Sequence, residues 1–453
     1  MSRSNPRTRL MRLISSHGVG SNSRSGAVFG LLLMTAFGLF PRAADADEHQ
    51  LPPRGFWLDQ MVAGWMSRLG QGIEAAWPNA PESVAMLSAI LQGSQLGPGE
   101  GWFKKAVAQT RYDWTTTARR FDRDGDGRIG SEEYPGPQSD FQRLDRNGDG
   151  VLDESDFDFS AHALMPSPGA MVFSLVDRDG NGKVTRDELD QFFRMADRDG
   201  VGFLSLADLQ RALPMPERRP SASGPSRWTL LKGLIRQEIG ALGPGPGLDA
   251  LAPDFTLRPV DGGQEVTLSK VVGPKPVVLI FGNITCGPFR NQAGNIEKLY
   301  RRYHDRATFL MVYVREAHPI DGWQMESNER VGVKLPQPRS DQERMTVAQM
   351  CNARLGLGFP ILVDTIEDPV GTRYSGMPSR LYLLDHRGRV AYKSGRGPFG
   401  FKPAELEHSL ILLLQDEFPE LNPHQKPTSA TTSQPPPHGR EPGSEFPANQ
   451  SAR

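Results

Sequence analysis

Short continuous apolar runs in the C-terminal half of the chain predict a buried, strand-rich domain over residues 251–418. Runs at 276–281 and 308–314 are typical of strands buried on both faces, and the segment between them, through residue 303, predicts a helix. This strand–helix–strand order predicts a right-handed βαβ unit. Further elements are expected in the order helix, strand, hairpin and helix, at residues 341–355, 360–363, 381–392 and 403–414. The pattern therefore indicates an α/β domain.

The N-terminal part of the chain shows a different pattern. Helical stretches broken by Gly and Pro predict a small helical region over residues 47–117. Before it, a basic leader, an apolar run at 27–40 and an Ala44-Asp45-Ala46 sequence predict a signal peptide over residues 1–46. The run is shorter than the ~20 residues that span a bilayer. We expect a secreted or periplasmic protein with no stable membrane insertion after cleavage; an uncleaved anchor or an internal apolar helix is the alternative.

The high content of glycine (48 residues) and proline (38 residues) indicates segments outside a packed core. Residues 214–250 are rich in Gly, Pro and Ser and predict a linker. Residues 419–453 contain almost no apolar side chains, so they cannot bury enough surface to fold. We expect a disordered tail there.

Charge is balanced overall and uneven along the chain. With 52 basic and 53 acidic residues the net charge is −1, which excludes a uniformly basic nucleic-acid binder, and we expect no nucleic-acid partner. Two cysteines exclude a disulfide scaffold. Residues 121–210 nevertheless hold 20 acidic and 9 basic side chains, a local net charge of −11. This asymmetry points to a function for the acidic block.

The acidic block contains four segments that begin Asp-Arg-Asp/Asn-Gly, phased as 12-residue loops with oxygen ligands at positions 1, 3, 5 and 7 and a carboxylate at 12. It resembles EF-hand proteins, which implies an all-α calcium-binding module over residues 118–213. The expected Ca²⁺ ligands are Asp122, Asp124, Asp126, the Arg128 carbonyl and Glu133 in the first loop; Asp145, Asn147, Asp149, the Val151 carbonyl and Asp156 in the second; and Asp177, Asp179, Asn181, the Lys183 carbonyl and Glu188 in the third.

The four loops differ in completeness. The first and third have every ligand, whereas the second ends in Asp156, which is shorter than the usual Glu and predicts weaker binding. The fourth has Val201 at position 5 and Asp208 at position 12, so we expect it to be weak or empty and to pair structurally with the third. The apolar position-8 residues expected to join paired loops are Ile129, Leu152, Val184 and Leu204. The short spacing favours a structural or buffering module, with switching left open.

The order of elements in the C-terminal domain resembles the thioredoxin fold. That fold places Cys286 at the N-terminus of a helix after the central strand, where free N–H groups stabilise a thiolate and lower its pKa. A small buried structural cysteine is the alternative. Phe289 occupies the position of thioredoxin's second Cys, so no C-x-x-C disulfide can form. Pro378 corresponds either to the cis-proline that faces the active Cys in this fold or to an ordinary trans turn proline.

Two segments carry a more specific resemblance. Residues 281–289 (FGNITCGPF) and 314–323 (VREAHPIDGW) resemble the two signatures of the iodothyronine deiodinases, with Cys286 where these enzymes carry selenocysteine. Shorter matches at 363–365, 380–382 and 395–398 extend the resemblance over about 276–414. The chain departs from the family at Asn283, where the family has Ser, and it has no His between His318 and His386.

The resemblance implies roles for five residues. Cys286 would be the nucleophile that takes iodine, and Glu316 and His318 an acid–base and hydrogen-bonding pair, with a His pKa near neutrality. Arg380 would contact an anionic part of the substrate, and Trp323 would line its site. A small-molecule substrate, an iodinated aromatic by resemblance, and a thiol reductant are the implied partners.

We therefore expect an exported, calcium-binding thiol oxidoreductase that performs reductive dehalogenation through Cys286. The alternatives are a redoxin-type thiol peroxidase or thiol–disulfide oxidoreductase, and a non-enzymatic calcium-binding protein. The other cysteine, Cys351, is either a buried core residue or a resolving thiol, which would require the two Cα atoms to lie within ~7 Å. Whether calcium regulates the thiol site also stays open.

Overall fold

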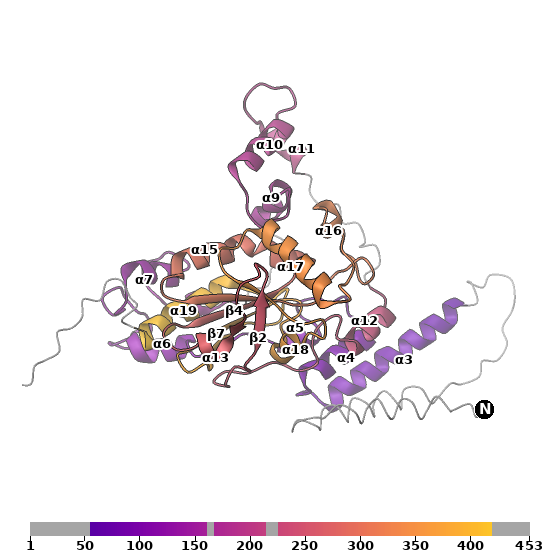
Figure 1. The fold of residues 1–453 in the computed structure, drawn as a ribbon, viewed down its shortest axis with the longest axis horizontal. Helices are drawn as coiled ribbons and strands as arrows, with labels where there is room; N and C mark the ends of the chain where they lie inside the picture. Colours follow the sequence, from indigo (N-terminus) through magenta and orange to yellow (C-terminus); the bar gives the residue numbers. More distant parts are fainter. Residues whose placement is uncertain (1–54, 161–166, 214–224, 419–453) are drawn as a thin grey trace, which may run out of the picture.

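The computed structural model describes residues 55–160, 167–213 and 225–418 (Figure 1). The predicted signal peptide, the first part of the predicted linker and the predicted tail lie outside these residues. Within the described ranges, no helix combines the length and the apolar character needed to cross a bilayer.

A mixed sheet of eight strands, in the order β1-β8-β7-β4-β5-β6-β2-β3, forms the centre of the molecule. Strand β4 (Val277–Gly282) pairs in parallel with β5 (Thr308–Tyr313) and antiparallel with β7 (Arg380–Leu384), which places Phe281 opposite Arg380. The other strands are β1 (Gln109–Thr110), β2 (Thr256–Pro259), β3 (Val266–Thr267), β6 (Ile361–Val363) and β8 (Val390–Lys393). The predicted α/β, thioredoxin-like architecture is confirmed.

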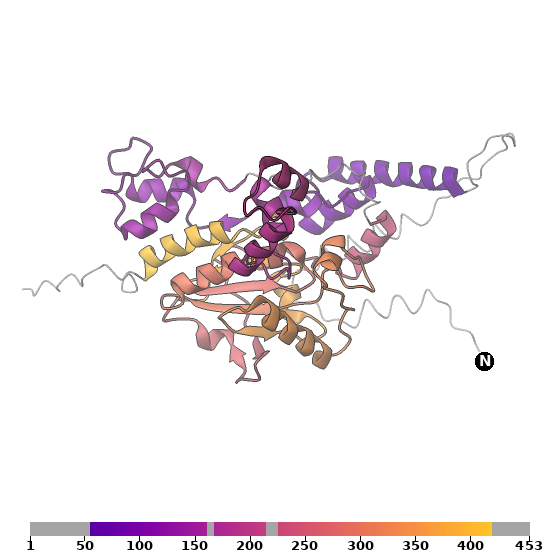
Figure 2. The same ribbon diagram turned by 90° about the horizontal axis from the view of Figure 1, so that it is seen from above.

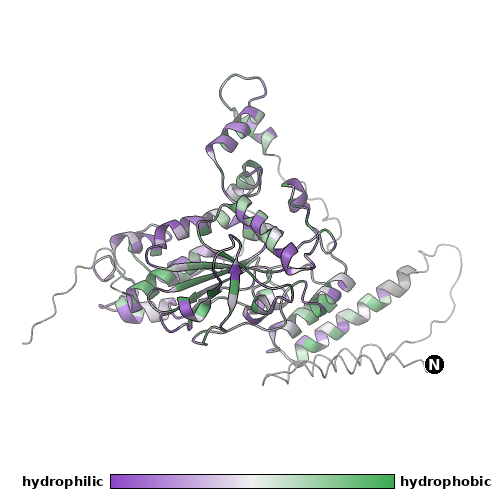
Figure 3. Ribbon diagram, viewed as in Figure 1, coloured by the Kyte–Doolittle hydropathy of each residue, from purple (hydrophilic) through white to green (hydrophobic). Residues whose placement is uncertain are grey.

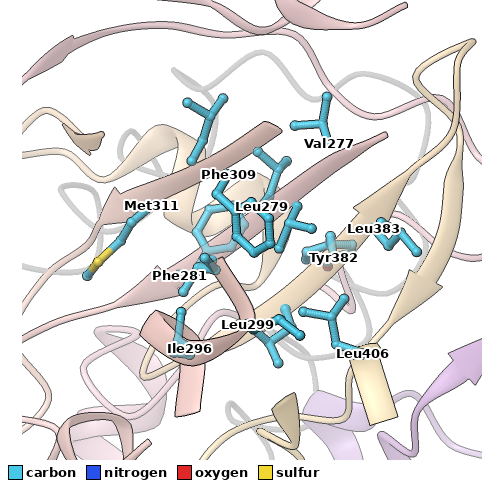
Figure 4. Close-up of a cluster of buried hydrophobic side chains, with 14 of the residues drawn as sticks. Val277, Leu279, Phe281, Ile296, Leu299, Phe309, Met311, Tyr382, Leu383 and Leu406 are labelled. Carbon is cyan, nitrogen blue, oxygen red and sulfur yellow. The ribbon is translucent and has the colours of Figure 1, made fainter. Parts of the chain in front are cut away.

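Helices cover the sheet, and apolar side chains fill the space beneath them. Helices α15 (Ala293–Tyr303) and α19 (Pro403–Glu417) contact each other on one face, and α17 (Asp341–Leu355) packs beside β6. Figure 4 shows β4 side chains meeting residues of α15 and α19, among them Leu279, Phe281, Ile296, Leu299 and Leu406. Figure 3 shows hydrophobic colour along the strands and hydrophilic colour along the outer helices. Shorter helices are α13 (Leu268–Val271), α14 (Gly287–Asn291), α16 (Glu326–Arg330) and α18 (Pro369–Tyr374).

Two regions hold more structure than the sequence predicted. The N-terminal helices α3 (Gly55–Ala76), α4 (Glu82–Gln92) and α5 (Gly101–Lys105) share a small core with α12 (Arg227–Ile235), which arises from the predicted linker. Strand β1 belongs to the region predicted as helical and adds an edge to the sheet beside β8. The flanking regions are therefore packed against the α/β domain.

The calcium-loop region forms two separate helix groups. The first contains α6 (Trp114–Phe121), α7 (Gln138–Leu144) and α8 (Glu154–Phe157); the second contains α9 (Pro168–Val176), α10 (Arg186–Ala196) and α11 (Leu206–Ala212). Figure 2 shows the first group beside α19 and the second over the middle of the α/β domain. The all-α EF-hand region followed by an α/β domain is as predicted.

The two groups differ in how their loops pair. Ile129 and Leu152 form the expected antiparallel bridge, with both N–H···O bonds at 2.9 Å. Val184 and Leu204 form no such bridge in the described part of the chain, although α10 and α11 are in contact. The expected position-8 pairing of the third and fourth loops is therefore wrong in this structure. The third loop instead makes contacts with the α/β domain.

Candidate functional site

Cys286 lies directly after the central strand, at the N-cap position of α14. Its side chain is buried, with 1% of the residue exposed. The Met377–Pro378 peptide bond is cis, and the Pro378 carbonyl accepts a hydrogen bond from Asn283 Nδ2 at 3.0 Å. The structure thus decides the open question about Pro378 and places it beside the loop that carries Cys286.

Asn283 joins the two signature segments. Its Oδ1 accepts hydrogen bonds from the Cys286 N–H (3.0 Å) and the Ala317 N–H (3.2 Å), and it lies 3.0 Å from the Thr285 hydroxyl, whose single proton it shares with Glu316. Asn283 is fully buried, so water cannot reach these donors and accept their hydrogen bonds in its place. The residue at which the sequence departs from the deiodinases therefore holds the cysteine loop against the segment that carries Glu316.

Replacing Asn283 with Ala should lower the free energy of unfolding by about 3 kcal/mol, because it leaves buried N–H donors without an acceptor. Urea titration of the full chain measures this change. Asn291→Ala is the matched control, since Asn291 is exposed on α14 and its replacement should change stability by less than about 0.5 kcal/mol. Equal stability of the two variants would contradict the role given to Asn283.

Glu316 reaches the residue next to Cys286. Its carboxylate accepts hydrogen bonds from the Thr285 hydroxyl at 2.7 Å, the Thr285 N–H at 3.1 Å and the Tyr313 hydroxyl at 2.5 Å. Burial raises its pKa despite these donors. The structure therefore brings Glu316 to the cysteine loop through Thr285, as a carboxyl group able to hold a proton.

His318 is held by Trp323 and Thr285. Its Nδ1 lies 3.1 Å from the Trp323 carbonyl, its ring meets the Trp323 ring edge-on at 4.7 Å, and its backbone N–H donates to the Thr285 hydroxyl. Burial lowers the pKa of His318 to about 4, so the expectation of a pKa near neutrality is wrong. Because a carbonyl only accepts, the neutral ring carries its proton on Nδ1 and leaves Nε2 as an acceptor.

The expectation of a lowered thiol pKa is also wrong. Burial raises the pKa of the Cys286 thiol to about 11, although the Phe289 N–H, the Arg290 charge and the Ser379 hydroxyl act in the opposite direction. Helix α14 has only 5 residues, and a helix terminus contributes modestly against the cost of desolvating a thiolate. Desolvation therefore outweighs the helix N-terminus.

Arg290 is a site residue that the sequence reasoning missed. Only 2% of it is exposed, and its guanidinium donates to the Ile284 carbonyl and, at 2.8 Å, to Asn328 Oδ1. Asn328 in turn donates to the Thr285 carbonyl at 2.7 Å. The i, i+4 spacing from Cys286 was the available signal, because it places both residues on one side of a helix. Arg290 supplies a buried positive charge beside the thiol.

The raised thiol pKa predicts a steep pH dependence. Alkylation of Cys286 should accelerate about tenfold per pH unit between about pH 7 and pH 10, because the thiolate is the reactive form and its population grows until the pKa is reached. Peptide-resolved mass spectrometry after timed labelling gives the rate. Cys351, whose pKa burial raises further, serves as the internal reference and should label more slowly. A rate that levels off below about pH 9 would contradict the raised pKa.

An open cavity of about 580 Å³ lies beside the second signature. Glu316, Ala317 and Trp323 line one side, and α12 from the predicted linker lines another. Four basic residues border it, Lys232, Arg236, Arg315 and Arg344. Glu316 belongs both to this lining and to the hydrogen bonds of the cysteine loop, so the cavity adjoins the thiol site. Apart from the apolar residues of α12, nothing in the sequence indicated that this helix would line the cavity.

Arg380 lies elsewhere. It is fully buried on β7, and its guanidinium donates to the Ser394 carbonyl and the Pro244 carbonyl, both at 3.1 Å. It does not line the cavity beside Glu316. This placement argues against the substrate contact that the resemblance implied, whereas Trp323 does line the cavity.

Cys351 occupies the core side of α17, and both cysteines are free thiols. The residue has 0% exposure and belongs to the same hydrophobic cluster as Cys286. Its position is that of a buried core cysteine, which was one of the two interpretations left open.

The first and third EF-hand loops gather carboxylates. Oxygens of Asp122, Asp124 and Asp126, and of Asp177, Asp179 and Glu188, lie within 4.8 Å of one another in each group. Six to eight oxygen ligands suit Ca²⁺, so the donor type and the spacing fit that ion. No comparable group of acidic side chains gathers in the second or fourth loop of the described chain.

The closing carboxylates of the second and fourth loops also accept hydrogen bonds within their own loops. Asp156 of the second loop accepts hydrogen bonds from the Arg146 and Asp153 N–H groups at 2.8 and 3.0 Å. In the fourth loop Asp208 pairs with Arg211 and Ser205. Glu133 and Glu188 accept equivalent N–H bonds in the first and third loops, so it is the gathering of carboxylates, and not these bonds, that follows the order of completeness predicted from the sequence.

Comparison with known proteins agrees with both resemblances. Residues 246–413 match the family model for iodothyronine deiodinase, and residues 119–134, 139–158 and 170–192 match the EF-hand model. Type I iodothyronine deiodinase of Xenopus laevis is 34% identical over 155 residues, 34% of this chain and 59% of that protein. Thyroxine 5-deiodinase of Sparus aurata is 31% identical over 164 residues, covering 36% and 60%, and that of Rattus norvegicus is 32% identical over 166 residues, covering 36% and 50%.

The chain thus spans half to three fifths of the length of these curated relatives, and the resemblance predicted from the sequence is confirmed for that region. Among solved structures, an uncharacterised conserved protein from Geobacillus kaustophilus aligns with 19% identity and a TM-score of 0.29 over 40% of this chain and 86% of that one. The thioredoxin domain of a thiol-disulfide oxidoreductase from Bacteroides vulgatus aligns with 17% identity and a TM-score of 0.26, covering 37% and 96%.

Proposed function

We propose that this protein is a thiol-dependent oxidoreductase that removes iodine reductively from an aromatic substrate, with Cys286 as the nucleophile. The observation that carries the proposal is the junction of the two deiodinase-like segments around the cysteine. Asn283 Oδ1 bonds the Cys286 and Ala317 N–H groups, and Glu316 bonds Thr285. The curated relatives that this region of the chain resembles are named as deiodinases.

In the proposed reaction, a sulfur–iodine bond replaces the carbon–iodine bond, and reducing thiols then restore the free cysteine. The Cys286 thiolate attacks iodine, the carbon–iodine bond breaks, and the aromatic carbon takes a proton, so that the carbon is reduced and the sulfur is oxidised. Glu316 is placed to hold that proton, because burial raises its pKa. A thiol reductant then attacks the sulfur–iodine group and releases iodide and a proton, leaving a mixed disulfide. A second thiol restores Cys286 and leaves as the disulfide of the reductant.

The cavity beside Glu316 fits an aromatic anion. Trp323 offers an aromatic face, and the basic side chains that border the cavity outnumber the acidic ones by four to three. Two of the basic side chains are paired with carboxylates, Arg236 with Glu238 and Arg315 with Asp368. Cys286 does not itself line this cavity, so its sulfur reaches a substrate there only when the 316–317 segment or the cysteine loop moves. The substrate class that follows is a small iodinated phenol or a related anion.

The first and third loops are proposed to bind Ca²⁺ through Asp122, Asp124, Asp126 and Glu133, and through Asp177, Asp179, Asn181 and Glu188, with the Arg128 and Lys183 carbonyls. The gathered carboxylates support this assignment. The second loop, with Asp145, Asn147, Asp149, the Val151 carbonyl and Asp156, would bind more weakly. Bound calcium would offset part of the −11 charge of the acidic block, since each ion carries +2. Export to a secreted or periplasmic location, where calcium is plentiful, is part of the same proposal and rests on the basic leader and apolar run of the sequence.

One pair of assays on the full chain tests the reaction. Dithiol-dependent iodide release from an iodinated phenol is measured beside dithiol-dependent peroxide consumption. Iodide release above the rate without protein supports the proposal. Peroxide turnover without iodide release would favour a redoxin-type thiol peroxidase, which a lone cysteine on a thioredoxin-like fold also suits. The absence of both activities would leave a calcium-binding protein without this chemistry.

A further inference from the structure

The third calcium loop is docked onto the α/β domain. The Gly182 carbonyl accepts a hydrogen bond from the Gly294 N–H at 3.1 Å, at the start of α15. Lys183 Nζ donates to the Leu355 and Gly356 carbonyls, at 2.7 and 3.0 Å, where α17 ends. Arg354 Nε donates back to the Asp179 carbonyl at 2.8 Å. Three positions of one loop are therefore bonded to two helices of the other domain.

This docking distinguishes the third loop from the first. A Cβ atom built on Gly182 would lie 1.9 Å from the Arg290 carbonyl oxygen, whereas one built on Gly127, at the same position of the first loop, would meet nothing within 4 Å. Asp177 and Glu188 are buried, with 4% and 9% exposure. The third loop thus holds its carboxylates inside an interface, where their mutual repulsion is poorly screened and a bound cation gains most.

The interface continues directly to the thiol site. Arg290, whose carbonyl touches Gly182, is the residue whose guanidinium holds Ile284 and Asn328 around Cys286. Arg354, which bonds the loop, also donates to the Val331 carbonyl, three residues after Asn328. The third loop is therefore connected to the groups around the Cys286 sulfur in two ways, through Arg290 and through Arg354.

We propose that calcium in the third loop fixes this loop against α14, α15 and α17, and thereby controls the reactivity of Cys286. Calcium requires the loop geometry that brings Asp177, Asp179 and Glu188 together, and this is the geometry seen in the docked loop. Calcium binding and docking are thermodynamically linked. If bound calcium favours the docked loop, docking also raises the affinity of the loop for calcium. The proposal rests on calcium binding by the third loop and not on deiodination.

The direction of the effect follows from burial. Cys286 is 1% exposed when the loop is docked, so calcium should slow its alkylation by holding Arg290 and the cysteine loop in place. A coupling in the usual range predicts about a tenfold slower reaction in calcium than in chelator. Removing the docking should abolish this difference and weaken calcium binding at the third loop.

Gly294→Ala tests the proposal, because the added Cβ would lie 2.3 Å from the Gly182 carbonyl oxygen and would block docking. Gly294 is neither a calcium ligand nor a contact of Cys286, and Ala favours a helix. The full chain, wild type and variant, is labelled with iodoacetamide in excess Ca²⁺ or in chelator, and the Cys286 peptide is quantified. Calorimetry with Ca²⁺ measures binding in parallel. We expect the wild type to show the calcium effect and the variant to lose it while the first loop still binds.

A second pair of variants keeps the test independent of helix packing. Lys183→Met removes the two side-chain bonds from Lys183 to the end of α17 but leaves the backbone carbonyl ligand, and should reduce the calcium effect. Arg128→Met makes the matching change in the exposed first loop and should leave the effect intact. Equal labelling of the wild type with and without calcium, or an unchanged calcium effect in Gly294→Ala, overturns the proposal. Failure of the calorimetric titration in the wild type overturns calcium binding itself, and neither result depends on iodide release.

Discussion

Cys286→Ser should reduce dithiol-dependent iodide release on the order of a thousandfold or more, to the rate without protein. A serine hydroxyl is almost never ionised near neutral pH and is a much poorer nucleophile toward iodine than a thiolate. The substitution keeps a small buried side chain that can still accept from the Phe289 N–H, so the loop should stay folded. Initial rates of iodide release, with circular dichroism of the variant, check both points.

Cys351→Ala is the matched control for this result. Cys351 is buried on the core-facing side of α17. It does not line the cavity and makes none of the hydrogen bonds of the loop that carries Cys286, so the first turnover should be unchanged. If multiple turnovers with dithiol also persist, the reductant acts directly on Cys286. Loss of later turnovers alone would identify Cys351 as a resolving thiol. Iodide release that survives in Cys286→Ser would contradict the assignment of the nucleophile.

The parts of the fold that could be predicted are those with a regular local sequence pattern. Strands β4 and β5 are unbroken apolar runs, and the EF-hand loops combine Asp and Gly at fixed positions, so both were found from the sequence. Strand β1 has only 2 residues and no pattern of its own. Helix α12 lies among Gly- and Pro-rich residues, and it is stabilised by tertiary contacts with α3 and α4 that no local pattern shows.

Most residues of the candidate site could be predicted from the sequence, but their pKa values could not. The signature segments identified Cys286, Glu316 and His318, and the structure brings these segments together. Their pKa values depend on how completely the groups are buried, and burial arises from packing by distant segments. The raised pKa of Cys286 and the lowered pKa of His318 therefore ran against expectations based on a helix terminus and on free imidazole. Arg290 was missed for the same reason, since its contact with Asn328 joins positions far apart in the chain.

Glu133→Gln combined with Glu188→Gln should weaken the tight calcium binding of the full chain on the order of a hundredfold. The position-12 carboxylate supplies two of the six to eight oxygens that Ca²⁺ needs, and an amide offers one uncharged oxygen in its place. Gln keeps the side-chain length and can still accept one of the N–H bonds that close each loop, such as that from Gly130 or Thr185. Isothermal calorimetry gives the affinity and the number of sites.

The single variants assign the sites, and exposed acidic neighbours control for charge. Glu188→Gln alone should remove one class of sites together with the calcium effect on Cys286 alkylation, whereas Glu133→Gln should remove the other class and leave that effect. Glu132→Gln and Asp187→Asn change the same charge one residue away, on exposed side chains outside the ligand positions, and should leave the affinity within about twofold. Unchanged affinity in the double variant would refute the assignment of both loops. An equal loss in both single variants would instead mean that the two loops bind as one cooperative unit, which their separation into two helix groups argues against.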